Sequence, residues 1–501
     1  MLVYYPNAFA QGFSLMPRFY KWLLFVGSLG LLALFSWDRL LGPSPHFHFL
    51  DLANSFLQGR LDTDTPKRFK GQRERPEDPK GLQRAVDRHL TGPDGTNVGW
   101  NDWASIHIIT LNDGTVVKGV YPWSDSQSDQ RYRFRTLDGT EMVIHPDHDI
   151  KRGCGSPGRL CDDTKYFVSF PPFPAIVFLP FFLLFGYDTN DVLFTVVNAA
   201  LNALFLFCFL QSLSLRGLSS RTPEENLFLS VLFTFGTVNF FSSIRGEVWF
   251  TALIMGVTLQ TLYIWAATDA RHSFLAGLAL ALGMATRTPI AFGSVFFGME
   301  LFRDGNRYVW RGFSYLVKKV LAFSAPVLAV GALLALYNYA RFENPFEFGH
   351  TFLAGGTRPS IREHGLFSFW FLKANLASAI TNPPVFDAFP PFIHITRHGL
   401  SLLFTSPFLL YLLWPKTFPP YARNLALAAF FVALPNLFYQ NTGWAQFGWR
   451  FALDFMPFLF AMLAVGSRRF TKGFLVLCIY AFLMNALGAI TFDRFPQFYY
   501  D

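Results

Sequence analysis

The chain has 501 residues, a formal net charge of +8, and 51% hydrophobic, 18% aromatic and 15% charged residues. Soluble domains carry about 25% charged residues, so this composition excludes a disordered, a collagen-like or a disulfide-dense small protein. The apolar residues gather into runs of about 18–25, the length that spans a bilayer, and predict a polytopic, mainly α-helical membrane protein. Its positive charge is then expected from cytoplasmic Lys and Arg that face anionic lipid, so we expect no nucleic-acid partner.

In chain order, we predict about 11 transmembrane helices, together with interfacial helices and a small extracytoplasmic β insert. The predicted spans are 22–41, 167–186, 192–214, 226–244, 247–267, 273–302, 320–340, 400–414, 424–440, 451–466 and 473–491. The first span follows Arg18 and Lys21 and lacks a small-residue cleavage site, which indicates a retained signal-anchor.

The positive-inside rule sets the orientation of these spans. Lys and Arg crowd the loops that follow the spans ending at 302, 414 and 466, so we expect these loops and the N-terminus in the cytoplasm. On this count Arg216 and Arg221 fall outside, whereas Arg245 and Glu247 face the cytoplasm. The run 273–302 is interrupted at a proline, which removes a backbone donor. Two half-helices there would change the topology of the middle of the chain.

The first outer loop contains most of the predicted domain organisation. We assign 1–59 to the first span and an interfacial helix, 60–97 to a polar connector, 98–150 to a small β domain and 151–501 to the multi-span body. The β domain is expected to hold two hairpins, because alternating strands flank Asn112-Asp113-Gly114 and Asp138-Gly139. Cys154 and Cys161 follow in CGSPGRLC, and either a local disulfide or a free pair suits that loop.

The second large outer loop, 341–399, is rich in Pro, Phe, Asn and His. It is too apolar for a free loop, so we expect interfacial helices and re-entrant backbone covering a cavity.

Polar residues near membrane depth are the candidate functional residues, because burying them is costly unless they are paired or used. They are Asp51, Asp162, Asp163, Arg245, Glu247, Arg341, His350, Arg450 and Asp454. Each has a structural alternative: a helix face for Asp51, a cap for Asp162 and Asp163, mutual ion pairs for Arg245–Glu247 and Arg450–Asp454, and a snorkelling role for Arg341. The sequence HPDHD at 145–149 fits no standard zinc spacing, and a solvated turn is favoured over a metal site.

Arginines at span ends and carboxylates in the first outer loop suit one chemistry. A lipid-linked phosphate needs cations near the headgroup plane, and an acceptor hydroxyl or amine needs a carboxylate that takes its proton. Both groups must meet at the membrane surface, because a lipid-linked substrate stays in the bilayer.

The order of several motifs resembles the membrane-embedded GT-C glycosyltransferase superfamily, which includes protein O-mannosyltransferases and the lipid A aminoarabinose transferase. The motifs are an acidic interfacial helix after the first span, YFVSFPP from Tyr166, GLALALGMATRTPIAF, GEVWFTA, YNYARFENPFEFG, HGLSLLFTSPF and GWAQFGWRFALDFMPF. They look like a largely uncharacterised bacterial branch and cover most of the chain outside 60–150.

The resemblance implies sugar transfer from a polyprenyl-phosphate donor to a glycan, lipid or protein acceptor. The reaction would be inverting and would occur on the outer face of a bacterial inner membrane, without a metal or other cofactor. It implies a general base at Asp51, Asp162 or Asp163. Donor phosphate and substrate contacts would come from Arg341, His350, Arg450, Asp454, Arg245, Glu247 and Tyr166. The chain departs from the superfamily where an acidic pair is usual, since SPHFHF carries no carboxylate before Asp51.

The alternatives to a glycosyltransferase are a transporter or lipid flippase and a non-catalytic envelope assembly subunit.

Overall fold

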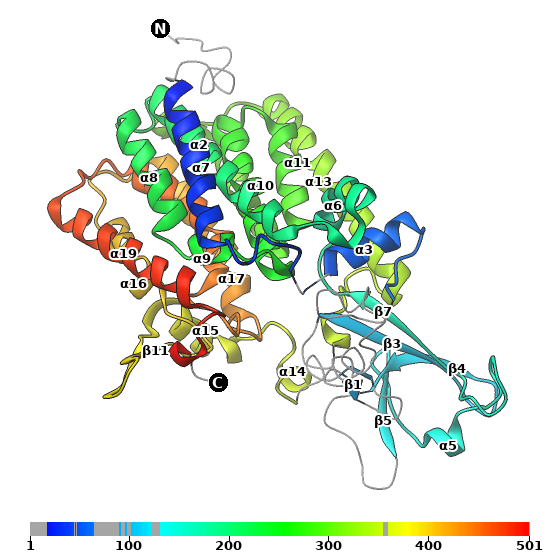
Figure 1. Cartoon of the computed structure of the whole chain (residues 1–501). Coiled ribbons are helices and arrows are strands. Elements are labelled where there is room, and N and C mark those ends of the chain that lie inside the picture. Colours follow the sequence, from blue (N-terminus) through cyan, green and yellow to red (C-terminus); the bar gives the residue numbers. More distant parts are fainter. Residues whose placement is uncertain are drawn as a thin grey trace. The chain divides into compact units, whose positions relative to one another are not determined.

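The structure is a computed structural model, and the fold is mainly helical with a small sheet (Figure 1). It describes residues 18–44, 46, 48–64, 90–91, 96–97, 102–121, 131–353 and 359–499. Most of the predicted connector 60–97 therefore lies outside the described residues. The chain forms two compact units: unit 1 comprises Met1–Pro43, Asn190–Val330 and Phe369–Asp501, and unit 2 comprises Ser44–Thr189 and Gly331–Ser368.

Unit 1 is a bundle of apolar helices. Its helices are α2 (Arg18–Phe35), α7 (Asp191–Leu215), α8 (Pro223–Phe235), α9 (Asn239–Ser243), α10 (Glu247–Ala267), α11 (Ser273–Met284), α12 (Ser294–Glu300), the first part of α13 (Phe313–Phe342), α15 (Leu372–Leu376), α16 (Leu402–Thr405), α17 (Pro420–Phe438), α18 (Met456–Val465) and α19 (Lys472–Thr491). Two short hairpins, β8 (Arg303–Asp304) with β9 (Arg307–Tyr308) and β10 (Val385–Phe386) with β11 (Ile393–His394), complete it.

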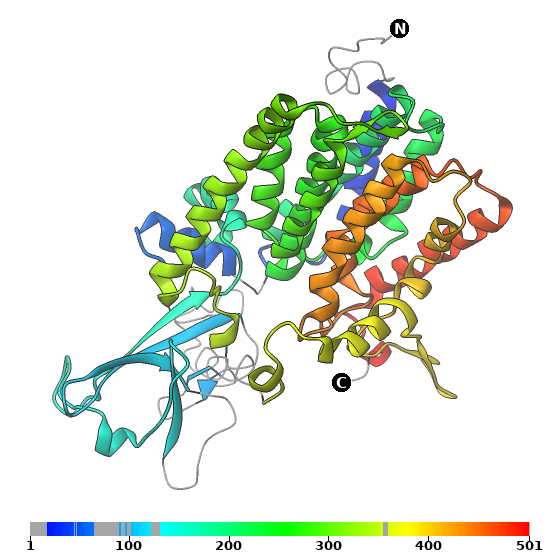
Figure 2. The same ribbon diagram turned by 180° about the vertical axis from the view of Figure 1, so that it is seen from behind.

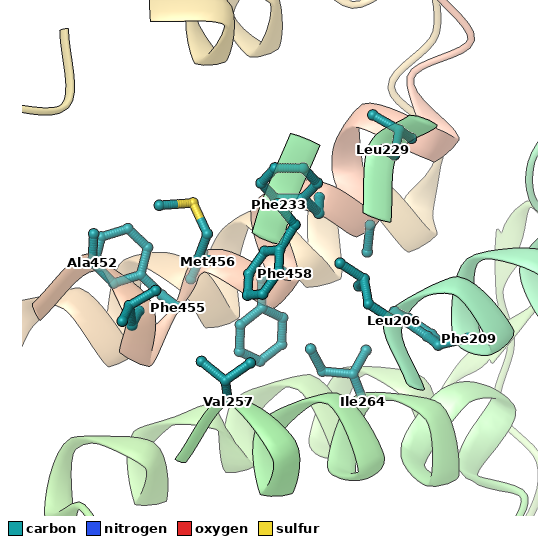
Figure 3. Packing of buried hydrophobic residues seen from close by; sticks show 14 of the residues in the cluster. Leu206, Phe209, Leu229, Phe233, Val257, Ile264, Ala452, Phe455, Met456 and Phe458 are labelled. Carbon is teal, nitrogen blue, oxygen red and sulfur yellow. The ribbon is translucent and has the colours of Figure 1, made fainter. Parts of the chain in front are cut away.

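The core of unit 1 is rich in phenylalanine, together with alanine and leucine. Figure 3 shows Phe209 of α7, Phe233 of α8 and Phe458 of α18 among the aliphatic side chains that fill the space between these helices. The edges of some rings face the planes of others. In the T-shaped pair Phe233–Phe460 the ring centroids are 5.3 Å apart, a geometry that the ring quadrupoles favour. Seen from behind, α17 (orange) lies beside the green helices of the same unit (Figure 2).

Five helices in the described part of the chain are long and apolar enough to cross a membrane. They are Asp191–Leu215, Glu247–Ala270, Phe313–Phe342, Pro420–Phe438 and Lys472–Thr491. Each matches one predicted span, but the predicted count of eleven is not confirmed. The predicted span 400–414 forms only α16 and the 3₁₀ helix Pro407–Leu413, and the predicted span 167–186 contains the 13-residue helix α6 (Phe173–Phe185).

Arginine and lysine gather at one end of unit 1. This basic end holds Arg216, Arg221, Asp269, Arg303, Lys319 and Arg468. Asp269 binds both Arg216 and Arg303, at 3.4 and 2.5 Å, and Lys319 donates to the carbonyl of Ala270. At the other end, Asn190 before α7 donates to the carbonyl of Leu40, and Arg39 donates to the carbonyl of Phe492.

The two ends correct the predicted topology of the middle of the chain. Arg216 and Arg221 lie with the other basic loops, whereas Arg245 and Glu247 lie at the end that holds Leu40, the end where the first span stops. One cause is that the predicted span 167–186 was counted as a crossing, although α6 is too short for one at about 20 residues. The other is the run 273–302, which forms α11 and α12 and returns to the end where it began: the backbone N–H of Asp269 binds the carboxylate of Glu300.

Unit 2 is a five-stranded antiparallel sheet with helices beside it. The strand order is β6-β5-β4-β3-β7, formed by Glu141–Ile144, Tyr132–Thr136, Val116–Val120, Trp103–Thr110 and Asp162–Val168. The helices are α3 (His48–Leu57), α5 (Pro146–Asp149), α6, α14 (Pro359–His364) and the end of α13, and β1 (Leu90–Thr91) pairs with β2 (Thr96–Asn97).

Both predicted hairpins are present in this sheet, and the reason is local. Gly114 and Gly139 take the left-handed φ values +89° and +91° that the turns require. Asp113 and Asp138 accept the backbone N–H two residues further on, which closes each turn. The sheet also contains β7, which lies outside the predicted β domain 98–150 and overlaps the start of the predicted span 167–186.

Two further features of unit 2 concern the paired cysteines, for which a disulfide and a free pair were the alternatives, and helix α3. Cys154 and Cys161 form a disulfide next to the sheet. Helix α3 packs against α6, with the rings of Phe49 and Phe178 stacked at 6.5 Å, and seven of its ten residues are buried, so its burial is not confined to one face. The second outer loop is divided between the units, because its residues up to Ser368 belong to unit 2 and those from Phe369 belong to unit 1.

Candidate functional site

Asp51 lies in the first turn of α3, where the helix dipole stabilises a negative charge. Its side chain is buried, with 5% of the residue exposed, so it is not on a solvated helix face. The hydroxyl of Tyr187 donates to its Oδ1 at 3.3 Å, and Asn54 donates to that hydroxyl at 3.1 Å. The carboxylate is therefore held in a fixed orientation by groups of its own unit.

A short series of contacts leads from α3 to Arg341. His48, one turn before Asp51, stacks on Trp103 with the ring centroids 3.7 Å apart. Trp103 pairs with Val168 across β3 and β7. The carbonyl of Val168 accepts a hydrogen bond from Nη1 of Arg341 at 2.8 Å. These five residues form what we call the Asp51–Arg341 cluster.

Arg341 is the most informative member of this cluster. It is 5% exposed, and its guanidinium lies 3.8 Å from the centroid of the Tyr337 ring. Its three nitrogens donate to the carbonyls of Val168 and Tyr337 and to the side-chain oxygen of Asn338. No carboxylate in the described part of the chain lies within ion-pair distance of it. A buried guanidinium with neutral partners favours an anion, because phosphate and carboxylate match its planar donors.

His350 lies close to Arg341 and is neutral at physiological pH. Burial and the positive charge of Arg341 lower the pKa of His350 to about 3. Glu347, the nearest acidic residue along the chain, accepts hydrogen bonds from the backbone of Gly349 and the hydroxyl of Thr351. His350 therefore adds a neutral polar group, not a second cation, beside Arg341.

Asp162 and Asp163 lie in β7, away from this cluster. Asp162 binds Nδ1 of the buried His107 at 2.9 Å, and Asp163 is exposed on the opposite face of the strand. Six residues separate Asp162 from Val168, a distance of about 20 Å along an extended strand. The helix that carries Asp51 is thus linked to Arg341 through His48, Trp103 and Val168, whereas Asp162 and Asp163 lie near the other end of β7.

Tyr166 contributes through its backbone. Its carbonyl accepts the N–H of Thr63 at 2.7 Å and so attaches the segment after α3 to β7. Its ring is partly buried.

Arg245 and Glu247 form a buried ion pair in unit 1, at 2.7 Å, as one of the two sequence interpretations predicted. Asp493 is a second partner of Arg245 at 3.0 Å, and Asp191 accepts the backbone N–H of Glu247. Between them Gly246 has φ +64°, and a Cβ there would lie 2.9 Å from the backbone of α7. Two carboxylates therefore bind this arginine, and the third, Asp191, holds the backbone of Glu247.

The expected Arg450–Asp454 pair is wrong. Residues Arg450–Asp454 form a 3₁₀ helix, in which residues four apart do not share a face. Asp454 instead binds Arg287 through both oxygens, at 2.6 and 2.7 Å, and Asn436 donates to it at 3.0 Å. Arg450 lies over the ring of Phe250 at 5.2 Å and donates to the carbonyl of Ala445. The sequence did not predict Arg287 as this partner, although Arg287 lies two residues before the proline that interrupts the run 273–302.

The HPDHD segment is a short helical turn in the structure. Asp147 binds Arg152, and Asp149 accepts the backbone N–H of His145. Within the described ranges, no group of three His, Cys, Asp or Glu residues could hold a metal ion.

No protein-family model, no curated protein and no solved structure matches this chain. Function is therefore inferred from the geometry of the sites.

Proposed function

We propose that this chain is a membrane glycosyltransferase that moves a sugar from a polyprenyl-phosphate-linked donor to an acceptor glycan, lipid or protein. The observation that carries the proposal is Arg341, a buried guanidinium with neutral partners at the end of a helix long enough to cross a membrane. A lipid phosphate arriving from the bilayer would supply the missing anion there.

Asp51 is the proposed general base. Its carboxylate would take the proton of the acceptor hydroxyl or amine as that atom attacks the anomeric carbon of the sugar. The bond between the anomeric carbon and the phosphate oxygen would break, and the lipid phosphate would leave with both bonding electrons, next to the positive charge of Arg341. Attack opposite the leaving group inverts the anomeric centre.

The orientation of the site follows from the charges of unit 1. The positive-inside rule predicts that the basic end faces the cytoplasm, so the opposite end of unit 1, from which the chain continues after Leu40 toward α3, would face the exterior or periplasm of a bacterial inner membrane. Polyprenyl-phosphate sugars, which stay in the bilayer, would reach Arg341 from the lipid phase.

Binding of undecaprenyl phosphate to the purified protein, measured by native mass spectrometry, tests the phosphate role. Charge-assisted hydrogen bonds contribute about 1.5–3 kcal/mol, so Arg341→Gln is expected to weaken binding about 10- to 150-fold. Arg362→Gln is the matched control, since Arg362 is a partly exposed arginine of the same unit paired with Glu141 at 3.1 Å. Equal binding by the two variants would refute the phosphate role.

Release of free polyprenyl phosphate from membrane-extracted lipid-linked sugars tests the base. Asp51→Asn is expected to abolish release while undecaprenyl phosphate still binds, and Asp163→Asn, on the exposed face of β7, is expected to retain activity. Full activity of Asp51→Asn would remove it as the base.

A transporter is the second candidate, favoured by the return of the chain through α11 and α12 and by the buried Arg287–Asp454 pair. Interrupted helices and buried charges are features of substrate pathways in transporters. A transporter would move the lipid-linked sugar across the membrane of a vesicle without releasing polyprenyl phosphate. The release assay therefore separates the two functions.

A further inference from the structure

An open hollow of about 780 Å³ lies at the basic end of unit 1, between the β8–β9 hairpin and the start of α17. Asn306, Arg307 and Tyr308 line it from the hairpin, and Thr417, Phe418 and Arg423 line it from the other side. Both sides belong to unit 1, so their arrangement is part of one compact unit.

The charge of this hollow is positive. Arg307 and Arg423 are both exposed, and neither forms an ion pair within the part of the chain that the structure describes. Asp304, the nearest acidic residue along the hairpin, is bound to Arg311 at 3.2 Å, and Glu300 is bound to Arg303. Among the described residues, the side chain of Arg423 makes one hydrogen bond, from Nε to the carbonyl of Phe418 at 3.3 Å, which leaves most of its guanidinium donors open to a ligand.

The rim of the hollow is aromatic and exposed. Tyr308 is 43% and Phe418 44% exposed, and Trp310 and Trp414, the neighbours of the lining residues along the chain, are 65% and 63% exposed. Aromatic residues of this kind concentrate at the level of lipid headgroups, where one side of the ring meets hydrocarbon and the other meets water. Helix α17, which begins at the hollow, is one of the helices long enough to cross a membrane.

We infer that this hollow binds the phosphate of an anionic membrane phospholipid. The two guanidinium groups would hold the phosphate oxygens, and Asn306 and Thr417 would donate to the headgroup. Phe418 and the neighbouring tryptophans would contact the first part of the acyl chains. Free phosphate shares the headgroup chemistry but has no acyl chain to contact these rings. The site is independent of the proposed transferase chemistry, because it uses neither Asp51 nor Arg341.

The test uses the full-length protein in detergent and native mass spectrometry with short-chain phosphatidylglycerol as the ligand. Each basic residue near an anionic lipid surface strengthens binding about fivefold. Removing two is therefore expected to weaken binding about 30-fold. The test variant is Arg307→Gln/Arg423→Gln. The control is Arg469→Gln/Lys472→Gln, which removes the same charge from exposed positions in the loop before α19 and at the first residue of that helix. Phosphatidylcholine is the neutral lipid control.

The inference requires two results. The test variant must lose phosphatidylglycerol binding, and the control variant must keep an affinity within about twofold of the wild type, well below the tenfold change that corresponds to 1.4 kcal/mol. Phe418→Ser should also weaken lipid binding, because it removes the apolar contact. Equal loss in both charge variants would show attraction by net charge alone and would overturn a defined site. Complete displacement of the lipid by millimolar inorganic phosphate would identify a free-phosphate site and would overturn the lipid assignment.

Discussion

Asp454 is one of the most deeply buried charges in unit 1, with only 1% of its side chain exposed. It accepts two hydrogen bonds from Arg287, whose side chain is 13% exposed, and one from Asn436. Substitution of Asp454 by Asn tests this burial. The amide keeps the size of the side chain and removes its charge, so Arg287 remains buried without a counter-ion.

The expected cost follows from that geometry. Breaking a buried ion pair by removing one partner costs about 3–5 kcal/mol, because the remaining charge is uncompensated. Asn436→Ala keeps both charges and loses one hydrogen bond to a charged group, so it should cost about 1.5–3 kcal/mol. Asp304→Asn is the control for the same chemical change, since its pair with Arg311 has side chains 63% and 24% exposed and contributes at most about 1 kcal/mol.

The assay is equilibrium unfolding of the purified protein in mixed micelles, with the unfolding free energy compared across the three variants. The double variant Arg287→Met/Asp454→Leu removes both charges and should recover most of the loss, because the uncompensated charge is gone. If Asp454→Asn loses no more stability than Asp304→Asn, water reaches Arg287 and the assignment of a buried pair is refuted.

The remaining predictions concern a disulfide, a helix contact and a histidine. Cys154 and Cys161 should resist alkylation until a reductant is added, and immediate labelling would contradict the disulfide. Gly277→Ala should lower the melting temperature at a cost of about 1–3 kcal/mol, because a Cβ there would lie 2.0 Å from a carbonyl oxygen of α13; Gly298→Ala, with open space around it, should not. His350 has a pKa of about 3 in the fold and about 6.5 when unfolded, so its contribution to stability is complete above pH 6.5 and falls as the pH drops toward 3. The melting temperature of His350→Gln measured from pH 8 to pH 4.5 should therefore approach that of the wild type as the pH falls, and parallel curves would contradict the pKa.

Local features of the fold were predictable from the sequence. The hairpin turns depend on neighbouring residues, since Gly114 and Gly139 supply the backbone angles and the preceding aspartates close the turns. The disulfide joins residues of one short loop, and α3 is amphipathic within its own ten residues. Each of these depends on interactions within a few residues, which a sequence pattern records directly.

Features that depend on distant residues were not predictable in the same way. Asp454 and Arg287 are 167 residues apart, so the regular spacing of Arg450 and Asp454 suggested the wrong pair. Strand β7 was missed because its apolar end runs into the hydrophobic sequence of α6, which hid the alternation of exposed and buried residues from Asp162 onward. The topology of the middle of the chain depended on whether two apolar runs cross the membrane, and hydropathy alone does not distinguish a crossing from a return.

The difference between local and long-range interactions also separates the candidate bases. Asp51, Asp162 and Asp163 are equivalent in the sequence, because each lies in the first outer loop near an apolar segment. The pairing of β3 with β7 makes them different, since it places Val168 beside Trp103 and leaves Asp162 six residues away along the strand, paired with His107. Arg341 binds at the Val168 end. In the proposed transfer, a base and a phosphate-binding cation would have to reach opposite sides of one anomeric carbon. A strand rises about 3.3 Å per residue, so Asp51 is the candidate base whose neighbours lie at the end of the sheet that Arg341 binds.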